Sequence, residues 1–147
     1  MSEPLDEMRN TTWRLFLVTQ VQVIEQIQKK LSAAKLPPLE WYDVLWALKK
    51  APDWRLRLSE LADQVLLSRS NLTRLLDRLE KNKLVQRKPC STDRRGTFAV
   101  LTEAGAVMQE TMWITYSDGI AEYFGDRLSD DEVQTLQQAF RKILLTH

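Results

Sequence analysis

Two short helical segments near the middle of the chain, separated by only a few residues, constrain the fold more than any other feature. Ser59 is suited to cap a helix over residues 60–65, because a serine hydroxyl accepts a hydrogen bond from an unpaired amide of the first turn. Ser68 is suited in the same way to cap a helix that runs to about Lys81. The gap between these helices is three or four residues. Two short helices joined so tightly form a helix-turn-helix.

The apolar residues give each of these helices one buried face. Leu61 and Val65 are expected to point inward from the first helix. The second helix has an apolar stripe at helical spacing, formed by Leu72, Leu75, Leu76 and Leu79. Its other face keeps polar and basic side chains.

A β-hairpin is predicted directly after the helix-turn-helix. Residues 84–87 alternate in part between apolar and polar side chains, and residues 97–101 are typical of a returning strand. The stretch 90–96 between them is polar and rich in turn-forming residues. A hairpin in this position is a wing. Residues 37–101 are therefore predicted to form a winged helix-turn-helix DNA-binding domain.

Amphipathic helices are predicted on both sides of this domain. The first covers about residues 8–34 and ends before Pro37 and Pro38, because proline cannot continue a helix. After the wing, Thr102 is suited to cap a long helix that ends near Gly125. The last helix begins with a capping box, in which Ser129 and Glu132 each bond the other's amide. Its expected buried stripe is Val133, Leu136, Phe140 and Leu144.

The predicted fold is mostly α with a two- to three-stranded wing: a winged helix-turn-helix flanked by N- and C-terminal dimerisation helices. Residues 1–36 with 102–147 make up the helical dimerisation region. One small lobe can hardly bury the apolar stripes of all these helices, so their faces favour a partner. The simplest partner is a second copy related by two-fold symmetry. Packing within one chain is the alternative.

Composition argues against catalysis and against a membrane. The only histidine is the last residue, His147, and Cys90 is the only cysteine. No Cys-His or Ser-His-Asp arrangement, zinc cluster or internal disulfide is therefore expected. No apolar run approaches the ~20 residues that span a bilayer, and the start of the chain does not resemble a signal peptide. We expect a cytoplasmic protein that is not an enzyme and needs no metal or cofactor.

Charge is distributed unevenly, although the net charge is only +1. Residues 55–95 contain eleven Lys and Arg against five Asp and Glu, whereas the remainder contains ten against fifteen. A basic middle between acidic ends is typical of a surface that binds a polyanion. A solvated helical face with scattered arginines is the alternative interpretation.

Several blocks of sequence between residues 56 and 105 form a joint pattern. In chain order they are LSELAD (58–63), LSRS (67–70), LTRLLDRLEK (72–81), LV (84–85), DRR (93–95) and LTEAG (101–105). Together they resemble the signature of the MarR family of bacterial transcriptional regulators. The chain departs from the family pattern at Leu66 and Lys83, where glycine is usual. In place of glycine, Asn82 is suited to be the left-handed cap of the second helix.

The resemblance implies double-stranded DNA as a partner. The start of a recognition helix reaches base edges in the major groove, where arginine suits guanine and asparagine suits adenine. The candidates on the second helix are Ser68, Arg69, Ser70, Asn71, Thr73, Arg74 and Arg78. Solvated surface arginines are the alternative.

The resemblance also implies that an arginine of the wing enters the minor groove, oriented by an aspartate. The candidates are Asp93, Arg94 and Arg95. We favour Arg95 as the inserted residue, because a narrow minor groove concentrates negative potential, and Arg94 as a phosphate contact. Further candidate backbone contacts are Arg55, Arg57, Arg78, Arg87 and Lys88.

Members of the MarR family often sense small aromatic or phenolic effectors in a crevice beside the dimer helices. The residues that suit such a site here are Trp13, Arg14, Trp41, Tyr42, Asp43 and Trp46. The alternative is that these tryptophans build core or interface. Cys90 is interpreted as an inert thiol rather than a redox sensor.

These observations predict a sequence-specific transcriptional regulator that binds double-stranded DNA. It would be a ligand-responsive repressor that acts as a homodimer on a pseudo-palindromic operator. The alternative is a winged-helix protein-interaction or small-molecule-binding module without specific DNA binding. Arginines on both the helix and the wing favour the first hypothesis.

Overall fold

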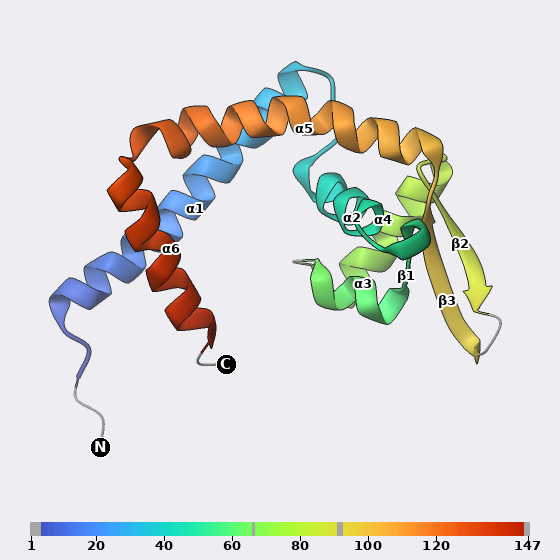
Figure 1. Ribbon diagram of the computed structural model, residues 1–147, viewed down its shortest axis with the longest axis horizontal. Helices are drawn as coiled ribbons and strands as arrows, with labels where there is room; N and C mark the ends of the chain where they lie inside the picture. Colours follow the sequence, from blue (N-terminus) through green and yellow to red (C-terminus); the bar gives the residue numbers. More distant parts are fainter. Residues whose placement is uncertain (1–3, 66, 91–92, 146–147) are drawn as a thin grey trace. The chain divides into compact units, whose positions relative to one another are not determined.

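The computed structural model describes residues 4–65, 67–90 and 93–145, with the backbone alone at 93–95. In chain order the elements are α1 (Glu7–Ala33), α2 (Leu39–Lys49), the 3-10 turn η1 (Pro52–Trp54), β1 (Arg55–Arg57), α3 (Leu58–Gln64), α4 (Arg69–Lys81), β2 (Val85–Cys90), β3 (Asp93–Leu101), α5 (Glu103–Tyr123), the 3-10 turn η2 (Gly125–Arg127) and α6 (Asp130–Leu145) (Figure 1). This order confirms the predicted fold class. Leu66, which stands where the family pattern usually has glycine, lies outside the described residues.

The chain divides into two compact units. One consists of Met1–Lys30 with Tyr116–His147, and the other is Leu31–Thr115. We call them the helical unit and the winged unit. All elements from α2 to β3 belong to the winged unit.

The buried core lies almost wholly in the winged unit. α2 contributes Val44, Leu45 and Leu48, each 0% exposed, and α3 contributes Leu61. The predicted stripe of α4 is buried along its whole length. Burial of one leucine stabilises the fold by about 1.5–3 kcal/mol. The core therefore fixes which face of α4 remains in solvent.

The sheet is antiparallel, with strand order β1-β3-β2. Leu56 on β1 and Arg87 on β2 both pair with Ala99 of β3, so all three lie on one face. The strands of the hairpin are longer than predicted, since Cys90 pairs with Asp93 after an irregularity at Pro89/Cys90. The predicted turn over residues 90–96 is thus too long, because Cys90 belongs to β2 and residues 93–96 belong to β3. Strand pairing carries the wing nearly to its tip.

The capping serine of α4 is as predicted, whereas that of α3 is not. The Ser68 hydroxyl accepts a hydrogen bond from the Asn71 amide at 3.3 Å. α3, however, begins at Leu58 and not after Ser59, with Arg57 in the capping position. The Arg57 amide donates to Glu60 Oε1 at 2.9 Å. A glutamate of the first turn, rather than a serine, therefore satisfies the amide at the start of α3.

Lys83, and not Asn82, takes the left-handed conformation that ends α4. Its φ is 63°, whereas Asn82 has φ −89°. The Leu84 amide donates to the Leu79 carbonyl and the Lys83 amide to that of Glu80, both at 2.9 Å. This pair of bonds defines a Schellman motif, which requires a left-handed residue at position 83. The prediction for Asn82 is therefore wrong, because the motif extends one residue further.

The start of α5 packs closely on the turn between α4 and β2. The Thr102 hydroxyl accepts from the Gly105 amide at 3.0 Å and donates to the Lys83 carbonyl at 2.7 Å. A Cβ added to Gly105 would overlap the Leu84 carbonyl and lie 2.6 Å from Leu101 Cδ1. Glycine is needed here for close approach. The predicted Thr102 cap thus also ties α5 to the turn between α4 and the wing.

The helical unit is held by local caps and a few contacts between helices. The capping box of α6 is confirmed, with Ser129 and Glu132 bonding each other's amides at 3.0 and 3.2 Å. Gly119 lets α5 approach α1, since an added Cβ would lie 3.0 Å from Ile27 Cγ1. Nothing on α6 is buried within one chain. The predicted stripe of α6 therefore remains partly or largely exposed.

Candidate DNA-binding surface

The first half of α4 presents a continuous polar face to solvent. All seven residues predicted for this helix and its cap are exposed, namely Ser68, Arg69, Ser70, Asn71, Thr73, Arg74 and Arg78. We call this set the α4 face. The buried leucines of α4 occupy the other side, so the side chains of the α4 face cannot turn inward. None of the three arginines forms an ion pair among the residues that the structure describes.

Local hydrogen bonds order the polar groups at the start of α4. The Ser68 and Ser70 hydroxyls lie 3.3 Å apart. The Thr73 hydroxyl donates to the Arg69 carbonyl at 3.0 Å, so its lone pairs are left to accept from a partner. The end of a helix where amides are unpaired also favours an anion such as phosphate. The geometry suits a nucleic-acid backbone with base edges beyond it.

Arg87 joins the wing to α4 through two carboxylates. Its guanidinium Nη2 lies 2.7 Å from Asp77 Oδ1 and 2.8 Å from Glu80 Oε1. Its backbone amide donates to Glu80 Oε2 at 3.0 Å. Sequence reasoning grouped Arg87 with the DNA contacts and missed this network. The signal was available, because Asp77 and Glu80 stand three residues apart on one face of α4.

The same network shifts the pKa values of Glu80 and Arg87. Hydrogen bonds from the Arg87 amide and then from its guanidinium hold the pKa of Glu80 below its usual value. The carboxylates in turn raise the pKa of Arg87. Two carboxylates face one guanidinium, so the positive charge of Arg87 is fully offset within the network. Arg87 therefore sets the position of β2 on α4 rather than adding free positive charge.

The outer face of the sheet carries two arginines around an aromatic ring. Arg55 and Arg57 lie with their guanidinium carbons 4.8 and 6.0 Å from the centre of the Phe98 ring. Lys88 pairs with Phe98 across the hairpin and is exposed. The backbone of 93–95 begins β3, and the side chains of Asp93, Arg94 and Arg95 lie outside the described residues.

The predicted effector residues fall in both units. Trp13 and Arg14 belong to the helical unit, where Trp13 is 54% exposed and lies against Phe16. The remaining four belong to α2. Tyr42 is buried, accepts a hydrogen bond from Gln109 at 3.3 Å and stacks on Trp113. The burial and contacts of Tyr42 therefore favour a role for this residue in the core, which was the alternative to an effector site.

The other α2 candidates differ in exposure. Burial raises the pKa of the Asp43 carboxyl. Trp46 is 42% exposed and lies under the Lys50 ammonium. The buried indole nitrogen of Trp41 has no hydrogen-bond partner within the described part of the chain. Neither of the two hollows described for the winged unit includes any of these residues.

Two further features bear on the chemistry available. Cys90 is buried at 6% exposure, which disfavours reaction with a dissolved oxidant. Over the described residues, no group of three or more His, Cys, Asp or Glu is placed to hold a metal ion. Within the same residues, no helix combines the length and the apolar character needed to cross a membrane.

Comparison with known sequences identifies relatives of one family. A sequence model described as MarR family matches residues 35–96. The HTH-type transcriptional regulator MhqR of Bacillus subtilis is 31% identical over 86 residues, 58% of this chain and 59% of MhqR. PrsX of Escherichia coli, also an HTH-type transcriptional regulator, is 34% identical over 106 residues, 72% of this chain and 63% of PrsX. The chain thus spans about three fifths of the length of these curated relatives.

Solved structures match over nearly the whole chain. AbsC, a MarR family regulator of Streptomyces coelicolor, has a TM-score of 0.87 at 29% identity, covering 99% of this chain and 97% of AbsC. Sco3205 of the same organism, solved with DNA, has a TM-score of 0.89 at 28% identity, covering 98% and 90%. A mutant of Escherichia coli MarR, solved with operator DNA, has a TM-score of 0.81 at 26% identity, covering 97% and 99%.

These findings agree with the order of helices and strands, with the sequence blocks and with the expectation that the chain is not an enzyme, since its relatives are regulators. The chain belongs to the MarR family.

Proposed function

We propose that the chain is a cytoplasmic transcriptional regulator that binds double-stranded DNA in a sequence-specific way as a homodimer. The observation that carries this proposal is the α4 face, seven polar and basic residues held outward on a helix whose other side is buried. Structures of Sco3205 with DNA and of the E. coli MarR mutant with operator DNA give the proposal further support. The proposal keeps the two domains predicted from the sequence: residues 37–101 bind DNA, and residues 1–36 with 102–147 dimerise.

The α4 face divides its work by residue chemistry. Arg69, Arg74 and Asn71 are the base-reading residues, because guanidinium and amide groups can form paired hydrogen bonds with guanine and adenine. Ser68, Ser70 and Thr73 contact phosphate or base edges, and Arg78 contacts the backbone further along. At the wing, Asp93 orients Arg95 into the minor groove while Arg94 contacts phosphate.

The dimer is inferred from an imbalance between the two units. Among the described buried apolar residues, Ile27 alone belongs to the helical unit, and all others lie in the winged unit. The helical unit nevertheless holds thirteen of the seventeen large apolar side chains that are exposed in the described structure. A unit with so little core and so much apolar surface needs a partner. A second copy meets this need and places two α4 faces on one pseudo-palindromic operator.

A repressor of this kind would respond to a small effector. A ligand that prefers a form of the dimer with misplaced recognition helices weakens DNA binding by typically about 1–3 kcal/mol. The effector site proposed from the sequence comprises Trp13, Arg14, Trp41, Tyr42, Asp43 and Trp46. The buried Tyr42 would then act as a wall of the site rather than as a polar contact.

The proposal is tested by selecting duplexes from a random pool with the purified chain at fixed salt. We expect a two-fold symmetric site with half-sites about one helical turn apart. Arg74→Ala should relax the preference at one position per half-site by about 1–3 kcal/mol, and Arg95→Ala should weaken binding with the fold and dimer intact. Arg141→Ala, an exposed arginine of α6, is the control and should change neither.

Two outcomes would count against the proposal. Retention of duplexes without an enriched pattern would leave only salt-dependent, non-specific binding. No retention at all would favour the alternative, a winged helix that binds a protein or a small molecule without specific DNA contact.

A further inference from the structure

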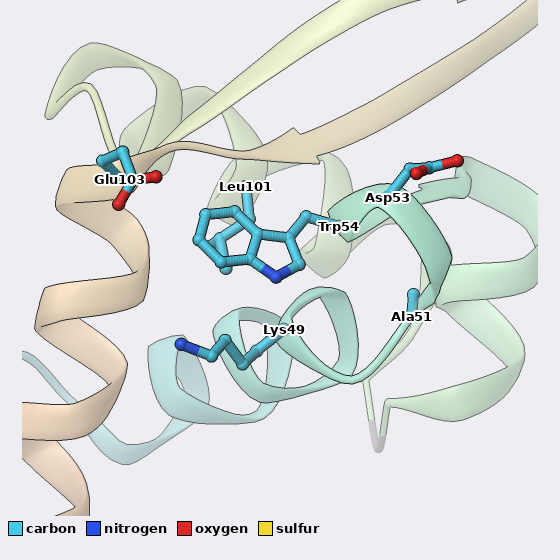
Figure 2. A pocket seen from close by; sticks show the side chains of 6 residues that line it. All are labelled: Lys49, Ala51, Asp53, Trp54, Leu101 and Glu103. Atoms are coloured by element: carbon cyan, nitrogen blue, oxygen red, sulfur yellow. The ribbon is translucent and has the colours of Figure 1, made fainter.

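A hollow of about 540 Å³ opens in the winged unit where α2, η1, β3 and α5 meet. Figure 2 shows the side chains that line it, which are Lys49, Ala51, Asp53, Trp54, Leu101 and Glu103. We call it the Trp54 hollow. It shares no residue with the α4 face or with the effector residues proposed from the sequence, so neither of those sites accounts for it.

An unusual backbone turn places the indole in this hollow. Asp53 and Trp54 are consecutive residues with φ of 57° and 56°, a left-handed conformation that aspartate tolerates but that is costly for tryptophan. The Trp54 amide donates to the Ala51 carbonyl at 3.1 Å, which closes the turn. Figure 2 shows the ring lying between Leu101 and the Lys49 side chain. Strain of this kind persists where the surrounding structure holds a group in a particular place.

The indole already receives one cation. The Lys49 ammonium lies 5.1 Å from the centre of the Trp54 ring, within the range of a cation–π contact. Lys49 also pairs with Glu110 at 3.1 Å. The charge of Lys49 is therefore balanced from outside the lining, and it leaves no net positive charge to attract an anion.

Two carboxylates of the lining are left without a balancing charge. Asp53 and Glu103 are both exposed, and neither forms an ion pair with any residue that the structure describes. In Figure 2 Glu103 lies beside the indole, whereas Asp53 lies on the turn at the other side, with its carboxylate directed away from the ring. An aromatic ring with a carboxylate beside it, in a lining that has more negative than positive charges, attracts an organic cation.

We propose that the Trp54 hollow binds a small organic cation, such as a quaternary ammonium compound that carries an aromatic group. The cationic head lies at the indole on the side of Glu103, Asp53 adds negative charge at the far rim, and the apolar part lies against Leu101 and Ala51. The opposite charge would be disfavoured, since a phenolate or benzoate would meet both carboxylates. This inference does not rest on DNA binding, because its readout is binding of the cation to the protein alone.

The test is calorimetric titration of the full chain with benzyltrimethylammonium. We expect saturation at one site per chain with a dissociation constant of about 1 mM or tighter. Asp53→Asn combined with Glu103→Gln should weaken binding at least about tenfold. Asparagine tolerates the left-handed conformation, so this variant keeps the turn. Glu40→Gln, which removes an exposed carboxylate of α2 outside the hollow, should bind as the unaltered chain does.

A third variant tests the ring itself. Trp54→Phe keeps an aromatic face of weaker cation affinity and should weaken binding by a smaller factor than loss of both carboxylates. The proposal is overturned if benzyltrimethylammonium does not saturate a site, if benzoate binds equally well, or if the double carboxylate variant, shown to be folded by its circular dichroism, binds unchanged. Loss of DNA binding in a parallel assay would bear on the proposed function and leave this result standing.

Discussion

At the scale of single residues, the end of α4 is set by its Schellman motif, and Thr102 holds the carbonyl of the left-handed residue in that motif. Lys83 adopts φ 63° because Leu84 must turn back to bond Leu79. The Lys83 carbonyl is then held by the Thr102 hydroxyl at 2.7 Å. These contacts offset the cost of a left-handed residue with a side chain, about 1–2 kcal/mol. Lysine is tolerated here, but glycine would adopt the same backbone without that cost.

We therefore expect Lys83→Gly to raise the free energy of unfolding by about 0.5–1 kcal/mol, the steric gain less the extra freedom of glycine in the unfolded chain. Asn82→Gly is the matched control. Asn82 has φ −89°, and its side-chain amide donates to the Arg78 carbonyl at 2.8 Å, so its replacement should destabilise. Urea denaturation of both variants gives the sign. A stabilising Asn82→Gly with a neutral Lys83→Gly would mean that the left-handed residue is at position 82.

The same scale shows which caps could be predicted. Ser68, Thr102 and Ser129 were found from the sequence because each hydroxyl bonds an amide within its own first turn. Ser59 was not a cap, because Glu60 reaches back to the Arg57 amide and starts α3 earlier. Lys83 was not predicted as the left-handed residue, although the glycine that is usual at this position was the available signal.

At the scale of elements, the wing depends on contacts distant in sequence. β1 is only three residues long and has no pattern of its own, and it exists because Leu56 pairs with Ala99 of β3. The α4–β2 contact depends on Arg87 and the carboxylates of Asp77 and Glu80. Local patterns predicted α4 and the presence of the hairpin, but not the full length of the two strands of the hairpin. They could not reveal that Arg87 faces inward toward α4.

The Arg87 network predicts a pH-dependent stability. The pKa of Glu80 is lowered in the folded chain, so its contribution is present above the ordinary carboxyl pKa and is lost as the pH falls through the lowered value. Glu80→Gln should lower the free energy of unfolding at pH 7 by up to about 1 kcal/mol, as expected for a partly exposed pair. The difference from the unaltered chain should shrink at about pH 3.

Denaturation curves at the two pH values test this expectation. Asp63→Asn removes an exposed carboxylate of α3 that forms no ion pair in the described structure, and it should show no comparable pH-dependent difference. If Glu80→Gln were as stable as the unaltered chain at pH 7, the network would contribute little and packing alone would hold β2 on α4.

At the scale of the whole molecule, the sequence predicts that the apolar faces of the outer helices need a partner, and this stays a prediction. The stripe of α6 was expected to be buried, yet Phe140 is 38% and Leu144 71% exposed within one chain. On α1, Leu15 is 60% exposed although the helix is well formed. Helix periodicity reports an apolar face, but it cannot say whether the same chain or a second copy covers that face. The oligomeric state of the protein answers this question.

We expect the chain to sediment at twice its own mass at micromolar concentration. Replacing Leu15 and Leu144 together by glutamate should raise the dimer dissociation constant by at least about a hundredfold, because each charge would have to be buried in an apolar interface. Val107→Glu alters an equally exposed apolar residue, at 60%, on the winged-unit part of α5, and should leave the dimer intact. A monomeric unaltered chain would remove the dimer from the proposed function, and a two-fold symmetric operator would then need another explanation. An intact dimer in the double variant would instead place the interface away from these two residues, and the exposed faces of α1 and α6 would still lack an occupant.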